Sequence, residues 1–97
     1  MSTGQGTLTF DFGSIPGTNM VTTTVTGEAS IGALSKVEIF MMGTDSTATH
    51  NSYEHSIIPL EMVMNCISVN AGSGFVARAI TTQRLTGTFT ARFVWAD

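Results

Sequence analysis

LTGTFTARFVW, at residues 85–95, alternates between two kinds of side chain over its whole length. Leu85, Phe89, Phe93 and Trp95 fall on one face, and threonines, an arginine and Val94 fall on the other. A period of two places alternate residues on opposite faces of a β-strand, so that one face is buried and the other meets solvent. We therefore predict one continuous strand over residues 85–95.

The same alternation recurs upstream, between clusters of turn-forming residues. It predicts further strands over residues 8–12, 20–31, 36–42, 56–64 and 75–82. Gly, Ser, Asn, Asp and Pro gather between them, at residues 13–19, 43–46 and 70–74. Pro59 has no amide hydrogen to donate to a sheet, so the 56–64 strand either lies at an edge or begins near that residue. Six to seven short strands at this spacing predict an all-β fold, a single antiparallel β-sandwich of the jelly-roll or Ig-like kind.

The length of 97 residues corresponds to a single domain. We expect residues 7–97 to form the sandwich and residues 1–6, MSTGQG, to form a flexible N-terminal arm. Cys66 is the single cysteine, so no intrachain disulfide forms, and we expect it to be a small buried hydrophobic residue.

Charged residues are scarce in this chain. They make up 11% of it, against about 25% in an average domain, and 16 threonines and 10 glycines account for much of the difference. The hydrophobic fraction of 42% is that of a globular protein and excludes intrinsic disorder. The net charge is −3 and the four cations are scattered, which excludes the basic patch of a nucleic-acid-binding protein.

Nothing in the sequence indicates a membrane. The first ten residues lack the basic and apolar regions of a signal peptide. No apolar run approaches the roughly 20 residues that cross a bilayer. We expect a protein without membrane contact that is made in a cytosol.

Residues 46–56, STATHNSYEHS, interrupt the β pattern and are expected to form either a long loop or one short helix. His50, Tyr53, Glu54 and His55 are the candidate binding residues of this segment, because segments of this kind in compact domains are often functional. On a helix His50 and Glu54 share a face, but His55 is rotated by about 100°, unlike the spacing of zinc-binding helices. We therefore expect no metal. Two alternatives stay open: solvated polar side chains, or a histidine that braces the turn by a hydrogen bond to the backbone.

Catalytic motifs are missing from the sequence. There is no nucleophile elbow, no phosphate-binding loop and no dinucleotide-binding glycine pattern. Both histidines lie in one segment, and no serine or carboxylate is placed beside them by any recognisable spacing. We predict a protein that is not an enzyme and has no cofactor.

The low charge points instead to contact with other proteins. Soluble domains commonly carry about 25–35% charged residues on their surface, which this composition does not supply. Apolar residues fall in the outward register of the predicted strands, and such patches mark protein–protein interfaces. The candidate contact residues are Phe40, Met42, Ile57, Pro59 and Val63. We predict a homo-oligomer, with residues 56–64 as a contact edge.

Four segments resemble small proteins encoded among the virion-structural genes of tailed bacteriophages. The segments are VTTTVTGEASI (21–31), GTDSTATHNSYEH (43–55), NAGSGFVARA (70–79) and RLTGTFTARFVWAD (84–97). The resemblance implies an all-β accessory protein of the virion, made in the host cytoplasm and held by other capsid or tail subunits. It implies capsid decoration or cement, or a head–tail or tail accessory component, and no catalytic residue.

A second reading keeps the virion but changes the partner. The 46–56 loop would then be the host-receptor-binding part of an adhesin-like module in a phage fibre. Lost adsorption with intact particles would favour this reading, and fragile particles with normal adsorption would favour cement.

Overall fold

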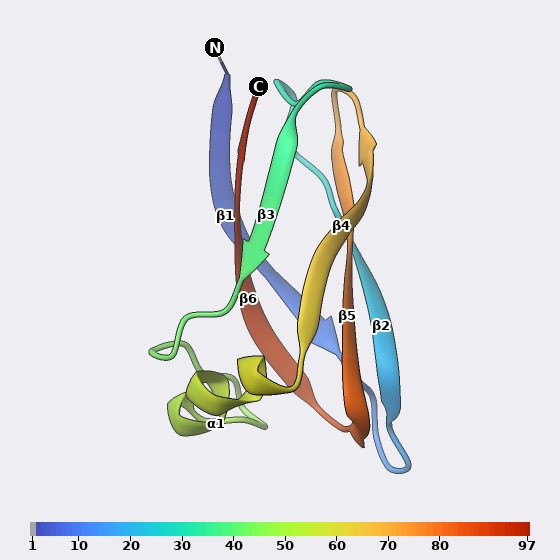
Figure 1. The fold of residues 1–97 in the computed structure, drawn as a ribbon, viewed down its shortest axis with the longest axis vertical. Helices are drawn as coiled ribbons and strands as arrows, with labels where there is room; N and C mark the ends of the chain where they lie inside the picture. The colour runs from blue at the N-terminus through green and yellow to red at the C-terminus, as the bar shows by residue number, and fades with distance from the viewer. Residues whose placement is uncertain (1) are drawn as a thin grey trace.

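A computed structural model describes residues 2–97 and shows two three-stranded antiparallel sheets packed face to face (Figure 1). The strands are β1 (Thr3–Asp11), β2 (Thr18–Val25), β3 (Lys36–Phe40), β4 (Val63–Asn70), β5 (Gly74–Leu85) and β6 (Thr88–Ala96). A short helix α1 (Ser52–Ile57) and a 3-10 turn η1 (Ile58–Leu60) lie between β3 and β4. The predicted all-β sandwich is confirmed, with six strands.

Each sheet has a long central strand. The first sheet has the order β1-β6-β3 and the second the order β2-β5-β4, so β6 and β5 are central and the other four strands are edges. In Figure 1 the chain ends meet at one end of the sandwich, and α1 lies near the other end beside β6. None of the helices in residues 2–97 combines the length and the hydrophobicity needed to cross a membrane.

The core lies between the two sheets and follows the alternation seen in the sequence. Phe10, Phe89 and Phe93 point inward from the first sheet, and Phe75 and the alanines of β5 point inward from the second. Phe75 meets Phe93 edge-on, with ring centroids 4.9 Å apart. Burial of each such ring stabilises the fold by roughly 1.5–3 kcal/mol, so the inward register of β5 and β6 fixes how the sheets stack.

The N-terminal segment differs from the flexible arm expected for residues 1–6. Residues 3–6 begin β1 and pair with β6, where Gly4 lies opposite Trp95 and Gly6 opposite Phe93. A side chain on either glycine would collide with the indole or phenyl ring that fills its place. Aromatic rings that cover cross-strand glycines in this way stabilise a glycine-containing strand. Met1 lies outside the described residues.

The single strand predicted over residues 85–95 is two strands joined by a tight turn. β5 ends at Leu85 and β6 begins at Thr88, and Gly87 in between has a φ of +79°. Its backbone is held on both sides, since its N–H donates to the Gly13 carbonyl and its carbonyl accepts from Phe12, each at 2.8 Å. A glycine at positive φ reverses the chain without steric cost, and the resulting β5–β6 turn connects the two sheets.

The predicted 56–64 strand is also wrong. Ser56 and Ile57 belong to α1, residues 58–60 form η1, and β4 begins only at Val63. Pro59 lies in the first turn of η1, where its missing N–H and fixed φ suit a helix start, and the strand that begins after it, β4, is an edge strand. The predicted strands 20–31 and 36–42 are shorter in the structure, ending at Val25 and Phe40.

The C-terminal part of the 46–56 segment is helical, because α1 begins at Ser52. Asn51 caps α1: its side chain accepts from the Glu54 N–H, and the Glu54 carboxylate accepts from the Asn51 N–H. This reciprocal pair satisfies two backbone donors that a helix start leaves open. Cys66 is half-buried in β4, and burial raises the pKa of its thiol.

Candidate interaction surface

The segment before and within α1 covers the side of β6 that faces β3, over the residues that β3 does not reach. β3 pairs with β6 only from Arg92 to Ala96. Beyond it, side chains bond the β6 backbone: the Thr47 hydroxyl donates to the Thr88 carbonyl at 2.7 Å, and the Thr88 N–H donates to the Thr49 hydroxyl at 2.9 Å. Side chains thus take the place of a neighbouring strand, which protects an open sheet edge.

His55 completes this cover from inside the protein. Its side chain is fully buried, and its Nε2 accepts from the Thr90 N–H at 3.0 Å. Its Nδ1 lies 2.9 Å from the Asn51 carbonyl, an acceptor, so Nδ1 carries the proton. His55 is therefore a neutral ring whose two nitrogens join the helix start to β6.

His50 packs against the same strand from the solvent side. Its ring stacks on Phe89, with centroids 3.9 Å apart and planes 16° from parallel. Its Nδ1 lies 2.9 Å from the Glu54 carboxylate and its Nε2 lies 2.6 Å from the Thr86 carbonyl. Both neighbours accept hydrogen bonds, so both contacts form together only when each ring nitrogen carries a proton.

The four candidate binding residues of this segment therefore occupy different environments. The structure brings His50 and Glu54 together, places His55 in the core, and leaves Tyr53 69% exposed. Both histidines show the backbone bracing that the sequence left as one alternative. Across residues 2–97, no three His, Cys, Asp or Glu side chains lie close enough to hold a metal ion.

Three carboxylates have a lowered pKa, and different hydrogen-bond donors cause the shift in each. The two hydrogen bonds from Arg92, at 2.8 and 2.9 Å, lower the pKa of Asp45. Hydrogen bonds from His50 and then from the Asn51 N–H lower the pKa of Glu54. The Ser35 hydroxyl, followed by the Ser2 backbone, lowers the pKa of Asp97 at the far end of the sandwich.

Acid is therefore expected to destabilise the protein. A carboxylate with a lowered folded-state pKa stabilises the fold above its ordinary pKa, here 3.8 for Asp and 4.5 for Glu, and this contribution disappears as the pH falls through the folded value. The urea midpoint should stay level near neutral pH and fall below about pH 4.5. Asp97→Asn should lower the midpoint at neutral pH and flatten the fall, whereas an unchanged midpoint down to pH 3 would contradict this explanation.

The five candidate contact residues do not form a single edge. Phe40 and Met42 lie along the outer side of the β1-β6-β3 sheet, with Phe40 half-buried. Ile57 and Pro59 lie in the helical connection. Val63, 64% exposed, is on the outer side of the β2-β5-β4 sheet.

Val63 belongs to a larger apolar surface that the sequence did not indicate. The strand register places Met20, Ile80 and Val63 side by side across the sheet, and all three are exposed. The next row is Thr22, Arg78 and Asn65. We call this surface the Arg78 face; its members are Met20, Thr22, Val63, Asn65, Ile67, Val76, Arg78 and Ile80. Ile67, 45% exposed, follows Val63 and Asn65 in the same alternation of β4 and so lies on this face.

Arg78 is the only charged residue of this face and has no acidic neighbour in its sheet. β2, β4 and β5 contain two arginines, Arg78 and Arg84, and no Asp or Glu. The Nε of Arg78 is covered and has no hydrogen-bond partner within the described part of the chain. This covered N–H is closed to an outside partner, but Arg78 makes no ion pair within the described residues, so its terminal nitrogens can bond an acceptor supplied from outside.

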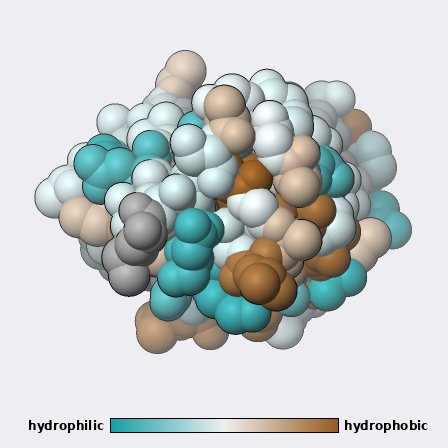
Figure 2. Space-filling view, turned by 90° about the horizontal axis from the view of Figure 1, so that it is seen from above, coloured by the Kyte–Doolittle hydropathy of each residue, from teal (hydrophilic) through white to brown (hydrophobic). Residues whose placement is uncertain are grey.

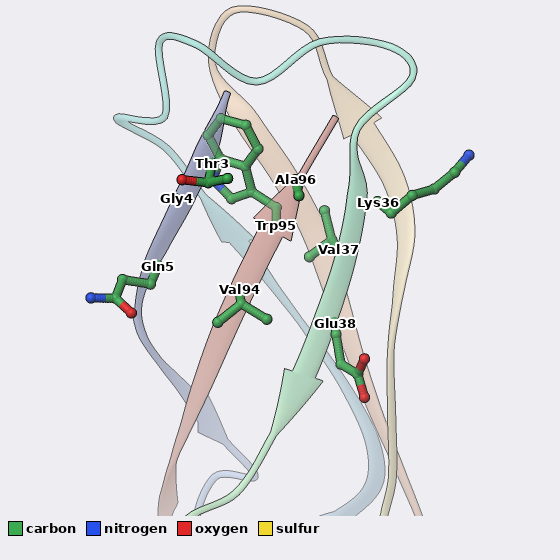
Figure 3. Close-up of a pocket in the computed structure, with 9 residues that line it drawn as sticks. All are labelled: Thr3, Gly4, Gln5, Lys36, Val37, Glu38, Val94, Trp95 and Ala96. Atoms are coloured by element: carbon green, nitrogen blue, oxygen red, sulfur yellow. The ribbon is translucent and has the colours of Figure 1, made fainter. Parts of the chain in front are cut away.

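A shallow groove of about 760 Å³ runs along the outer side of the opposite sheet (Figure 3). Val94 lies at its middle, with Gln5 on the β1 side and Glu38 on the β3 side. A second hollow, with Phe40 and Met42, continues it past Val94. We call the two together the Val94 groove. Glu38 is exposed and has no hydrogen-bond or ion-pair partner within residues 2–97, and the Lys36 side chain points away from Val94.

Comparisons with protein-family models, with curated protein sequences and with solved structures find no match to this chain. Two surfaces are thus candidate interaction sites because of the side chains that they expose. One is an apolar face around an unpaired arginine, and the other is a groove beside an unpaired carboxylate.

Proposed function

We propose that this protein is a non-enzymatic structural component of a tailed-bacteriophage particle, acting through protein–protein contacts. Within the particle it decorates or cements the capsid, or it serves as an accessory of the head–tail junction or the tail. The Arg78 face is the observation that supports a contact role, and the resemblance of the four sequence segments supports the phage setting.

The Arg78 face has the composition of an interface. Met20, Ile67, Ile80 and Val63 are between 37% and 64% exposed on one side of one sheet. Interfaces are depleted in charge at their centre and enriched in Met, Arg and aromatic residues. Figure 2 shows a related mixture at the end that carries the chain termini, where brown hydrophobic residues lie among pale neutral ones.

The receptor-binding alternative has less support. It assigns recognition to the 46–56 segment, but His55 is buried and both ring nitrogens of His50 face backbone or carboxylate acceptors of the same chain. Tyr53 is the member of the four candidates whose side chain extends most into solvent. A receptor would thus meet Tyr53 and the rim of α1, while the histidines hold the segment in place.

Charging the Arg78 face tests the proposed function. Ile80→Lys should leave the urea midpoint nearly unchanged, because Ile80 is on the outer side of β5, and should strongly reduce the amount of protein incorporated into purified phage particles. Ile15→Lys is the matched control, since Ile15 is 89% exposed in the β1–β2 turn, away from this face. Incorporation is measured by quantitative immunoblot of particles. Absence of the wild-type protein from particles would overturn the proposal.

A further inference from the structure

We propose that two copies of this chain associate head to tail, with the Arg78 face of one copy in the Val94 groove of the next and Arg78 paired with Glu38 of that neighbour. The inference rests on the proposed function as a contact protein and names its first partner, a second copy. The two surfaces lie on the outer sides of opposite sheets, so a copy that uses one still offers the other.

The Arg78 face is a poor partner for itself. A two-fold dimer brings the same patch of both copies together. Here neither copy of the sheet has an Asp or Glu to pair with the Arg78 of the other copy, and both copies carry the same positive charge. Like charges across an interface disfavour it. The chain therefore has to satisfy Arg78 with a carboxylate from a different surface, which makes the contact heterologous.

The Val94 groove supplies the missing partner groups. Its floor is apolar at Val94, 41% exposed, and at the half-buried Phe40, and it can receive the row formed by Met20, Ile80 and Val63. Glu38 stands beside this floor without a partner of its own. The other acidic group near the groove, Asp45, is already bound by both nitrogens of Arg92. Glu38 is therefore the free carboxylate for Arg78.

The size of the two faces is sufficient for a stable contact. The molecule measures 40 × 24 × 21 Å, so a broad face is about 40 Å long and 21–24 Å wide. That area is comparable with the roughly 800 Å² that each partner buries in a standard interface. The Arg78 face, which spans residues 76–80 of β5 and both neighbouring strands, is the apolar part of that area. Repetition of a heterologous contact gives a ring if it closes and an open stack if it does not.

Charge exchange between Arg78 and Glu38 tests this pairing. The mass of the wild-type protein, measured by size-exclusion chromatography with light scattering, should rise with concentration. Arg78→Glu and Glu38→Arg should each weaken association by at least ~10-fold. The double variant Arg78→Glu/Glu38→Arg should restore most of it. The control variant Arg84→Glu/Glu38→Arg makes the same charge changes but replaces the other arginine of β5, and it should not restore association.

Circular dichroism and the urea midpoint of each variant check that it folds. A wild-type protein that stays monomeric at all concentrations would overturn the head-to-tail contact. So would a double variant no better than the single ones, because association would then not depend on this pair. If the protein is monomeric but Ile80→Lys still blocks incorporation into particles, the contact between copies is wrong while the proposed function stands.

Discussion

Replacing His55 with alanine is expected to lower the free energy of unfolding by about 3–5 kcal/mol. The ring is fully buried, so its removal leaves a cavity beside Phe89, whose ring centroid lies 5.1 Å from that of His55. It also leaves the Thr90 N–H without its acceptor. Urea unfolding followed by circular dichroism measures the change as a shift of the midpoint.

Two further substitutions in the same helix identify the cause. Tyr53→Ala removes a larger side chain that is 69% exposed and should change stability by only about 0.5 kcal/mol. His55→Gln keeps an acceptor in reach of the Thr90 N–H and should recover part of the loss. A His55→Ala variant as stable as Tyr53→Ala would show that the 46–56 segment does not brace β6.

Gly87→Ala is expected to cost about 2–5 kcal/mol, the second largest effect. A φ of +79° costs a residue with a Cβ roughly 1–2 kcal/mol. The added methyl would also lie 2.6 Å from the Thr49 hydroxyl and 3.1 Å from the His50 Nε2. Crowding of this kind typically adds 1–3 kcal/mol, and here it pushes on the segment that covers β6.

Gly72→Ala is the matched control for this prediction. Gly72 has the same φ of +79° in the β4–β5 turn, but nothing lies within 4 Å of the position that its Cβ would take. It should therefore show the backbone cost alone, about 1–2 kcal/mol. Equal losses for the two alanine variants would mean that Thr49 and His50 move aside at little cost, and that the β5–β6 turn and the 46–56 segment are not tightly packed.

The sequence predicts the sheets well because a strand's alternation is a local property. Phe75, Ala77 and Ala79 are buried as that pattern requires. The same property hides the turn between β5 and β6: its two residues, Thr86 and Gly87, keep the alternation in phase as the chain passes from one sheet to the other. Periodicity alone therefore does not separate one long strand from two strands that meet at a tight turn.

The errors arise where the deciding contact is distant in the sequence. Gly4 and Gly6 are typical of a flexible arm until Trp95 and Phe93 of β6 are placed over them. Met20 and Ile80 do not stand out in their own segments, and only the register of three strands joins them to Val63, a predicted contact residue, in one row. The backbone-bracing role of the histidines was open from the sequence, but not which strand they brace.

The side chains that cover the open side of β6 also protect this protein against aggregation through strand pairing. Without Thr47, Thr49 and His55, the backbone groups of Thr88 and Thr90 would face outward as an unsatisfied ladder. Such a ladder recruits strands from other chains and seeds aggregation. The 46–56 segment therefore keeps this stretch of β6 from pairing with a strand of another chain.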